Sequence, residues 1–364
     1  MRATLRDPAL TSHAGRFVWL EVNYDSPKNE AFLASHVNEG YPLLMVLSPE
    51  GEALGMWTGG ASVAELKGFL DRSTAAPQGD KADAALRRGD ALLARNDLAG
   101  AETQYREALS LGGKGWPGHD YAIGQLMGAQ QLRDGHSCAA TAAAEAPTMA
   151  RKHPFVGVAG AGLSCALGDE AAIPPALEAL AREALALPDA SEDDRYQLYD
   201  ALIMARGRAG DVAGRRALAE KYLDLVEHAP PPRGDDQRMA RDLARLRAAT
   251  ALGAPERVIP ALEATERALP GDDNSSARLA TAYAAAKRYD DAIAACTRGL
   301  AREPGPTGAA RLLVARASAE TQKGDGAAAW KDLTAALEAA KRIPIAAVRD
   351  QMTGQLQKRL DKAR

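Results

Sequence analysis

The sequence predicts a mainly α-helical protein, an array of helical hairpins preceded by a small α/β segment. Three observations support this fold class. Aromatic residues make up only 5% of the 364 residues although 46% are hydrophobic, which favours closely packed helices over an aromatic-cored sheet protein. Small residues recur at one fixed spacing along most of the chain. Short apolar runs bounded by turn signals near the N-terminus predict strands.

The helical spacing is clearest between Asp273 and Pro306. Ala280, Ala292 and Gly299 stand twelve and then seven positions apart, and small side chains at such offsets let two antiparallel helices approach closely. One hairpin cannot bury its apolar face alone, so such units must stack on their neighbours. The same spacing is found in Gly89, Ala101 and Ala108, in Ala249, Ala261 and Ala268, in Ala317, Ala329 and Ala336, and more loosely in Gly160, Ala172 and Ala179.

These units resemble tetratricopeptide repeats (TPRs). The family has small residues at the eighth, twentieth and twenty-seventh places, an aromatic residue at the eleventh or twenty-fourth, and a proline near the end. Tyr283, Tyr105 and Pro304 stand at such aromatic and proline places. The resemblance implies a right-handed superhelix of helical hairpins, a TPR-like solenoid, over residues 82–364. The tryptophan often found early in the repeat is missing, and no register can be assigned over residues 114–155 and 190–235.

Elements of both kinds are predicted ahead of the repeats. The expected order is a helix entry, a strand, a helix, two strands and a final helix, over Asp7–Leu10, Phe17–Val22, Ser26–His36, Leu43–Leu47, Ala53–Thr58 and Ser62–Arg72. Phe17–Val22 is mostly apolar on both faces, as central strands of α/β sheets are. Ser62 and Glu65 have the spacing of a capping box, which predicts a helix start.

This order, with Tyr41-Pro42 just before an apolar strand, resembles the C-terminal part of a thioredoxin fold. The resemblance implies a cis peptide bond at Pro42 and a domain that lacks its first strand and active-site helix. No C-x-x-C motif exists in the chain, so the dithiol of that family is missing. The expected organisation is a partial thioredoxin-like domain over residues 1–72, a linker over 73–81 and the repeats over 82–364.

Charge and hydropathy exclude several classes of partner. The 45 basic and 48 acidic residues leave a formal net charge of −3, without the basic footprint of a nucleic-acid-binding protein. No run of eighteen apolar residues exists, so no membrane span is expected. No signal peptide is visible, which predicts a cytoplasmic location for the chain as written. A missing upstream segment would instead make it periplasmic or exported.

The residues that could carry chemistry are few. Three cysteines, an odd number and widely spaced, count against a disulfide framework. His136, Cys138, His153 and Cys165 include metal-ligand types, but their spacing matches no strong zinc pattern. Acidic pairs at Asp193-Asp194, Asp235-Asp236 and Asp272-Asp273 stand where helices begin, so capping explains them. We therefore predict no catalytic residue, no metal ion and no cofactor.

The predicted function is a non-catalytic scaffold for protein–protein interaction, with a protein or peptide partner in the concave groove of the repeats. The groove places lack the Lys, Arg and Asn of the family's carboxylate clamp; they hold Leu86, Asp90, Ala277, Thr281, Val314 and Ser318. The alternative is a thiol–disulfide oxidoreductase or disulfide chaperone whose C-x-x-C-bearing N-terminal segment is absent from this sequence.

Overall fold

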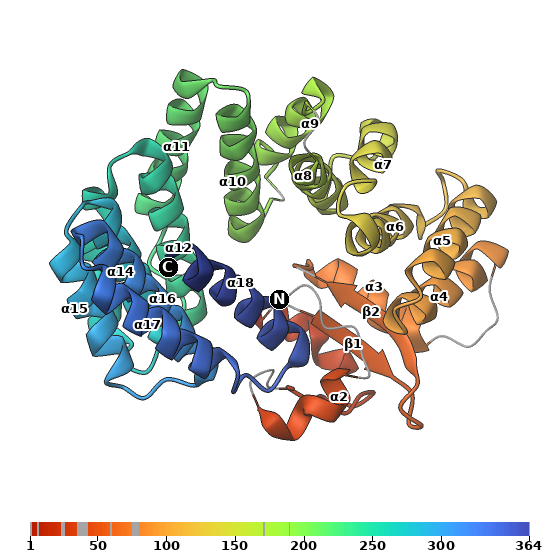
Figure 1. Cartoon of the computed structure of the whole chain (residues 1–364). Coiled ribbons are helices and arrows are strands. Elements are labelled where there is room, and N and C mark those ends of the chain that lie inside the picture. Colours follow the sequence, from red (N-terminus) through yellow and green to blue (C-terminus); the bar gives the residue numbers. More distant parts are fainter. Residues whose placement is uncertain are drawn as a thin grey trace. The chain divides into compact units, whose positions relative to one another are not determined.

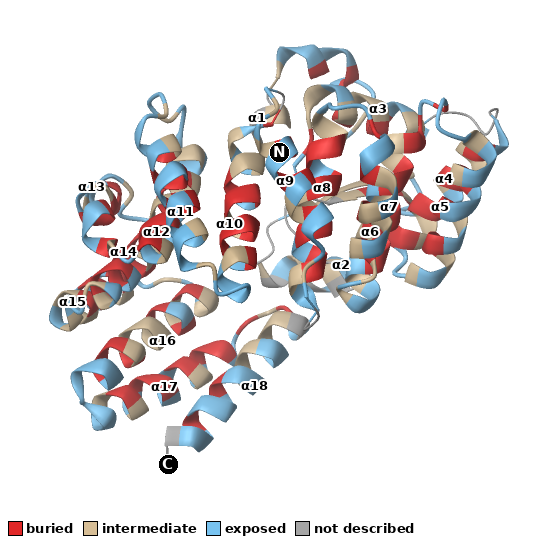
Figure 2. Cartoon of the chain, turned by 90° about the horizontal axis from the view of Figure 1, so that it is seen from above, coloured by how far each residue is buried: buried red, intermediate tan, exposed pale blue. Residues whose placement is uncertain are grey.

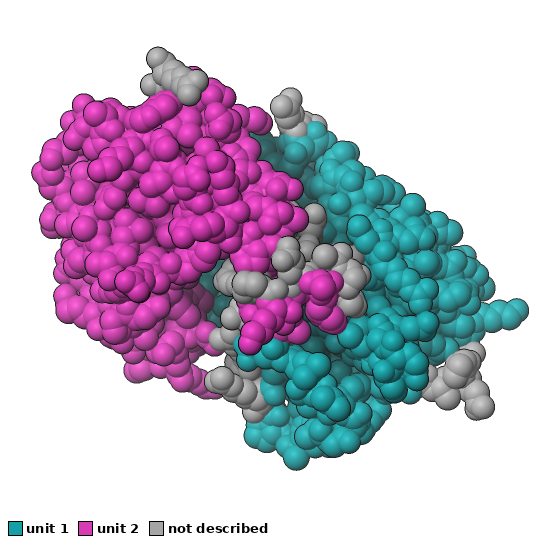
Figure 3. All heavy atoms as spheres, turned by 60° about the horizontal axis from the view of Figure 1, so that its bottom comes forward, with its two compact units in different colours: residues 1–21, 35–210 teal, residues 22–34, 211–364 magenta. Residues whose placement is uncertain are grey.

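The computed structural model is mainly α-helical, with a single two-stranded sheet among the described residues (Figure 1). It describes residues 2–5, 7–22, 26–34, 43–58, 60–74, 80–169, 172–188 and 190–363. The chain divides into two compact units, drawn in separate colours in Figure 3. Unit 1 comprises residues 1–21 and 35–210, and unit 2 comprises residues 22–34 and 211–364.

The sheet of unit 1 consists of β1 (Leu43–Leu47) and β2 (Ala53–Thr58), as the sequence predicts. The two strands pair antiparallel, with Leu43 opposite Thr58 and an irregularity after Val46. The turn between them places Gly51 at φ +86°, a conformation that a glycine adopts without strain. The hydroxyl of Ser48 accepts hydrogen bonds from the backbone amides of Glu50 and Glu52, which fixes the turn.

Two helical elements of the N-terminal segment also form as predicted, alongside the short helix α1 (Arg2–Leu5). Asp7 caps the 3₁₀ helix η1 (Pro8–His13) through the amide of Ala9. The helix α3 (Val63–Thr74) begins at the expected capping box, in which the carboxylate of Glu65 accepts from the amide of Ser62 at 2.8 Å. The buried side chains of α3 are those of Leu66, Phe69 and Leu70.

The predicted strand at Phe17–Val22 is wrong, because this segment is irregular and follows a bend. Val18 and Leu20 are 88% and 80% exposed. An apolar run becomes a strand only where a neighbouring strand and a covering layer are available, and β1 pairs only with β2 among the described residues. The candidate cis proline, Tyr41-Pro42, lies outside the described residues. The helix expected over Ser26–His36 is described as η2 (Pro27–Asn29) and α2 (Glu30–Ala34), in unit 2.

The repeats of unit 1 are consecutive helical hairpins. Asp97 caps the second helix of the first hairpin through the amide of Gly100, after Asn96 turns the chain at φ +62°. The poorly assigned stretch 114–155 forms a hairpin of its own. The helices are α4 (Lys81–Ala94), α5 (Leu98–Gly112), α6 (His119–Asp134), α7 (Cys138–Glu145), η3 (Ala146–Thr148), α8 (His153–Gly168), α9 (Pro175–Leu185) and α10 (Glu192–Arg208).

Unit 2 repeats the pattern, and buried residues gather along the sides where neighbouring helices meet (Figure 2). A methyl group at Gly299 would lie 2.9 Å from both Leu312 and Ser276, so three helices meet closely there. The helices are α11 (Val212–Glu227), α12 (Asp235–Leu252), η4 (Pro255–Val258), α13 (Ile259–Ala268), α14 (Asp273–Ala285), α15 (Tyr289–Leu300), α16 (Pro306–Lys323), α17 (Gly326–Ala340) and α18 (Ala346–Ala363).

Most residues at the expected packing places are buried in these helices: Gly89, Ala101, Tyr105, Ala108, Ala249, Ala280, Tyr283, Ala292, Gly299, Ala317, Ala329 and Ala336. Pro304 is half-buried just ahead of α16. Ala268, however, is exposed and Ala261 only half-buried, because η4 separates α12 from α13 and turns Leu262 and Thr265 inward instead. Of the looser set, Gly160 is half-buried, whereas Ala172 and Ala179 are exposed.

None of the described helices combines the length and the apolar character needed to cross a membrane.

Candidate functional site

Asp90 of α4 is the centre of a buried polar network on the face of the first two hairpins. Its carboxylate accepts hydrogen bonds from Tyr105 Oη at 2.9 Å, Tyr121 Oη at 3.2 Å and Gln125 Nε2 at 3.3 Å. Burial raises the pKa of Asp90 to about 6, although the hydrogen bonds and the charge of Arg72 act in the opposite direction. Burial and the neighbouring carboxylate also raise the pKa of Tyr105 and Tyr121.

The β-hairpin lies on this same face. Gln125 Nε2 donates to the backbone carbonyl of Met56 at 2.9 Å, so a helix side chain of α6 holds the main chain of β2. Trp57 stacks on Tyr121 with ring centroids 5.5 Å apart, and the guanidinium of Arg72 lies 3.9 Å from the centre of the Tyr121 ring. Met56 belongs to one apolar core with the side chains of α4, α5 and α6.

This arrangement corrects the expected groove. Leu86 and Asp90 are predicted to line an open groove, yet they are 0% and 3% exposed because the chain's own β-hairpin covers α4. In unit 2 three of the four corresponding places are more accessible: Thr281 is exposed, and Val314 and Ser318 are half-buried. The fourth, Ala277, is buried at 8% exposure.

His153, the first residue of α8, joins three helices of unit 1. Its Nε2 lies 3.1 Å from Asp194 of α10, and its Nδ1 lies 2.7 Å from Glu65 of α3. The Nδ1 contact departs from the direction of a hydrogen bond, so we describe it as an ion pair. Asp194 and Glu65 together raise the pKa of His153 to about 10, so the imidazole is charged near neutral pH. Both carboxylates also complete capping boxes, with Ser191 and Ser62.

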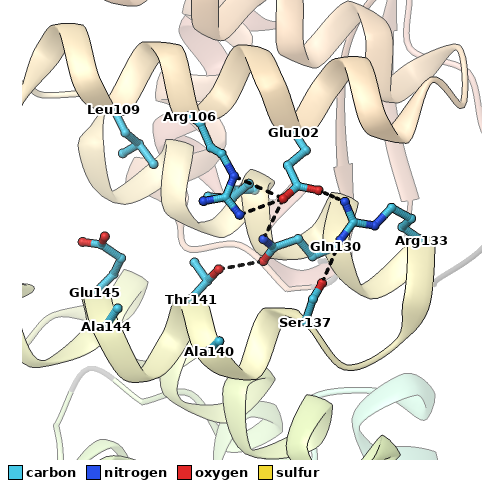
Figure 4. Close-up of a pocket in the computed structure, with 11 residues that line it drawn as sticks. Glu102, Arg106, Leu109, Gln130, Arg133, Ser137, Ala140, Thr141, Ala144 and Glu145 are labelled. Atoms are coloured by element: carbon cyan, nitrogen blue, oxygen red, sulfur yellow. Dashed lines mark hydrogen bonds and ion pairs between the residues drawn. The ribbon is translucent and has the colours of Figure 1, made fainter.

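An open pocket of about 540 Å³ lies between α5, α6 and α7 (Figure 4). Its polar end is built around Glu102, which accepts from Arg106 at 2.7 Å, from Gln130 at 3.1 Å and from Arg133. Burial alone would raise the pKa of Glu102, but these hydrogen bonds and the charges of the two arginines hold it below its usual value. The carboxylate of Glu102 is therefore ionised and already hydrogen-bonded to side chains of the protein itself.

The third wall of the pocket is α7. Thr141 donates to Gln130 Oε1 at 2.8 Å, and Arg133 donates to Ser137 at 3.2 Å, so the polar network spans all three helices. The other lining side chains are those of Leu109, Leu126, Ala140, Ala144 and Glu145. The lining thus combines the Glu102 network with short apolar side chains and the carboxylate of Glu145.

The four histidines and cysteines with metal-ligand chemistry do not converge. Cys138 and Cys165 form a disulfide, which corrects the expectation drawn from the odd cysteine count. His136 is exposed and bonded to the carbonyl of Asp134, whereas His153 is held by the two carboxylates described above. Among the described residues no group of three potential ligands gathers. The remaining thiol, Cys296, is buried, and burial raises its pKa to about 12.

The acidic pairs stand at helix starts, as expected from capping. Asp194 completes the capping box of α10, and Asp272 accepts from the amide of Asn274 at the start of α14. Asp235 is the first residue of α12.

Sequence reasoning missed the charged residues that organise unit 1. The sequence predicts Asp90 only as a residue lining the groove and His153 only as a weak metal-ligand candidate. It predicts no role for Glu102. One signal pointed towards the network: Tyr105 stands at an aromatic packing place, and a buried tyrosine hydroxyl needs a partner.

No protein-family model and no curated protein sequence matches the chain. Solved structures that resemble it include a tetratricopeptide repeat protein from Parabacteroides merdae, 14% identical over 76% of this chain and 98% of that one, with a TM-score of 0.48. The TPR2AB domain of yeast Sti1, solved in a complex with pHSP90, is 15% identical over 76% of this chain and 98% of its own, with a TM-score of 0.27.

Proposed function

We propose that the chain is a non-catalytic scaffold for protein–protein interaction, whose helical hairpins bind an extended segment of a partner protein. One observation carries the proposal: α6 holds the extended strand β2 through a hydrogen bond from Gln125 to the backbone carbonyl of Met56 and through the stacking of Trp57 on Tyr121. A helix face that recognises main chain and one aromatic side chain has the elements of a peptide-binding surface.

The partner surface that we propose lies on the first helices of the hairpins in unit 2, namely α12, α14 and α16. By the resemblance to TPRs these helices line the concave groove. They carry eight basic and five acidic side chains, whereas α13, α15 and α17 carry three basic and six acidic ones. Three of the basic side chains on the first helices, however, pair with carboxylates outside those helices: Arg278 with Asp272, Arg316 with Asp332 and Lys323 with Asp290. The surface is therefore close to neutral, and its net charge selects no class of partner.

Two exposed threonines give a matched test of this surface. Thr281 of α14 and Thr334 of α17 are both exposed, and each hydroxyl bonds to the carbonyl four residues earlier. We expect a photo-cross-linking residue at position 281 to capture peptides from a random library, and the same residue at position 334 to capture none. Equal capture at both positions would contradict the proposal.

The thioredoxin-like part of the proposal concerns residues 1–72. The order β1, β2, α3 supports a partial thioredoxin-like domain, whereas the irregular segment at Phe17–Val22 counts against its central strand. The domain limits of 1–72, 73–81 and 82–364 stay predictions. The alternative of a thiol–disulfide oxidoreductase has no support in the cysteines of the chain, because two are bonded to each other and Cys296 is buried.

A further inference from the structure

Two of the three cysteines meet in the interior of unit 1. Cys138 is the first residue of α7 and Cys165 lies in the last turns of α8, twenty-seven positions later. Their Cα atoms are 5.9 Å apart, their sulfur atoms are bonded, and they are only 0% and 1% exposed. A bond so deeply buried is shielded from exchange with thiols in solution, so its role is structural and not catalytic.

Little apolar burial holds the helix that this bond secures. α7 has eight residues, and a helix of this length is marginal unless it is packed or linked. The side chains that it buries are those of Cys138 and Ala142. Where it crosses α8, a methyl group at Gly162 would lie 2.2 Å from the Cβ of Ala142, so the helices touch through small residues. Burial of such small side chains supplies little hydrophobic free energy.

The same helix forms one wall of the pocket between α5 and α6. Ser137, Thr141 and Glu145 line that pocket, and the first two are bonded to Arg133 and Gln130 of α6. If α7 moved away from α8, the pocket would lose this wall and the hydrogen bonds that cross it. The geometry of the pocket therefore depends on the link between α7 and α8.

We infer that the disulfide between Cys138 and Cys165 fixes α7 to α8, keeps the pocket formed, and requires an oxidising environment when the chain matures. The two thiols lose two protons and two electrons as the S–S bond forms. The electrons pass to a disulfide of an oxidant protein or small molecule, which is reduced to two thiols. Such bonds form and persist mainly in oxidising compartments. This inference is independent of the proposed partner.

The bond is tested on the full chain, folded in a glutathione buffer with equal amounts of the reduced and oxidised forms. After denaturation without reductant, we expect alkylation of one cysteine, Cys296, and an intact mass lower than that of the fully reduced chain by two hydrogen atoms. The Cys296→Ala variant should then take up no alkylating agent before reduction. Alkylation of all three cysteines in the denatured wild type would overturn the inference.

The effect on α7 is tested by hydrogen exchange of the unsubstituted protein with and without a reductant that opens the buried bond. The closed loop of twenty-seven positions leads us to expect faster exchange in α7 on reduction, on the order of a hundredfold, with α16 and α17 unchanged. The Cys138→Ala/Cys165→Ala variant should reproduce the change. If the rate of hydrogen exchange in α7 did not change on reduction, the bond would not secure the helix.

Discussion

A carboxyl group in an apolar interior needs donors, and Asp90 shows how the repeats supply them. Two tyrosines and one glutamine surround it, each from a helix of the first two hairpins, and Arg72 contributes charge from α3. Because burial outweighs these partners, the folded protein holds the proton of Asp90 more tightly than the unfolded chain does. The residue therefore links the packing of the β-hairpin to pH.

Asp90 makes the stability of unit 1 fall as pH rises. With a folded pKa of about 6 against 3.8 in the unfolded chain, its contribution is complete below pH 3.8 and is lost as pH rises through 6. The loss is on the order of 2–3 kcal/mol. We expect Asp90→Asn, which keeps an acceptor for Tyr105, to flatten this part of the stability profile.

The measurement is the free energy of unfolding in urea at pH 4.5 and pH 7, for the wild type and the variant. Other carboxylates titrate in the same range, so the quantity compared is the difference between the two proteins. Glu107→Gln, a change at an exposed residue of α5, serves as the control. Its free energy of unfolding should change between pH 4.5 and pH 7 by the same amount as that of the wild type. If the free energies of unfolding of the wild type and Asp90→Asn changed equally between pH 4.5 and pH 7, Asp90 would be ionised throughout that range.

At the scale of the helix, the distance at which two helices pack depends on where glycine residues lie. Gly89 of α4 faces the ring of Tyr105 on α5, and a methyl group there would lie 2.5 Å from it. Tyr105 is fully buried and bonded to Asp90, so its ring cannot withdraw. Gly124, in the middle of α6, is exposed and a methyl group there meets nothing within 4 Å.

These two glycines give opposite predictions for one substitution. Gly124→Ala should stabilise unit 1 by up to about 1 kcal/mol, since alanine is the better helix former. Gly89→Ala should destabilise it by ~1–3 kcal/mol, because overpacking outweighs the gain in helix propensity. Thermal unfolding followed by circular dichroism compares the two. A stabilising Gly89→Ala would mean that the α4–α5 contact is looser than described.

At the scale of the whole molecule, each of the two compact units has a distinct organising feature. In unit 1 the N-terminal segment packs on the repeat helices, and His153 ties α3, α8 and α10 together. In unit 2 the first helices carry the more accessible groove places, Thr281, Val314 and Ser318. The proposed partner surface therefore lies in unit 2, whereas the chain's own β-hairpin fills the corresponding face of unit 1.

Removal of the His153 cation should destabilise unit 1. His153→Ala leaves Glu65 and Asp194 partly buried without their shared counter-charge, and we expect a loss of ~2–3 kcal/mol at pH 7. Because the folded pKa of about 10 exceeds the unfolded value of 6.5, the stabilisation is complete below pH 6.5 and disappears as pH rises through 10.

Urea unfolding at pH 6.5 and pH 10 measures this effect. The free energies of unfolding of the wild type and His153→Ala should differ at pH 6.5 and become nearly equal at pH 10. His136→Ala is the matched control, since His136 is an exposed histidine. If the difference in the free energy of unfolding between the wild type and His153→Ala stayed the same as pH rises, His153 would stabilise the fold by packing and not by its charge.

Features that depend on neighbouring residues follow from the sequence alone. The strands at Leu43–Leu47 and Ala53–Thr58, the capping box at Ser62 and the hairpin with Gly89 and Ala101 follow from local patterns, because turns, caps and helix periodicity act over a few positions. The stretch 114–155, although it resisted a register, is helical as expected.

Interactions between residues distant in sequence became apparent only in the folded chain. Phe17–Val22 has the composition of a strand but no strand pairs with it among the described residues, and Ala268 keeps the repeat spacing but is turned outward by η4. The burial of Asp90 under β2 and the pairing of Cys138 with Cys165 also depend on contacts between separate helices. Such contacts depend on how whole elements pack, and no local pattern in the sequence encodes that packing.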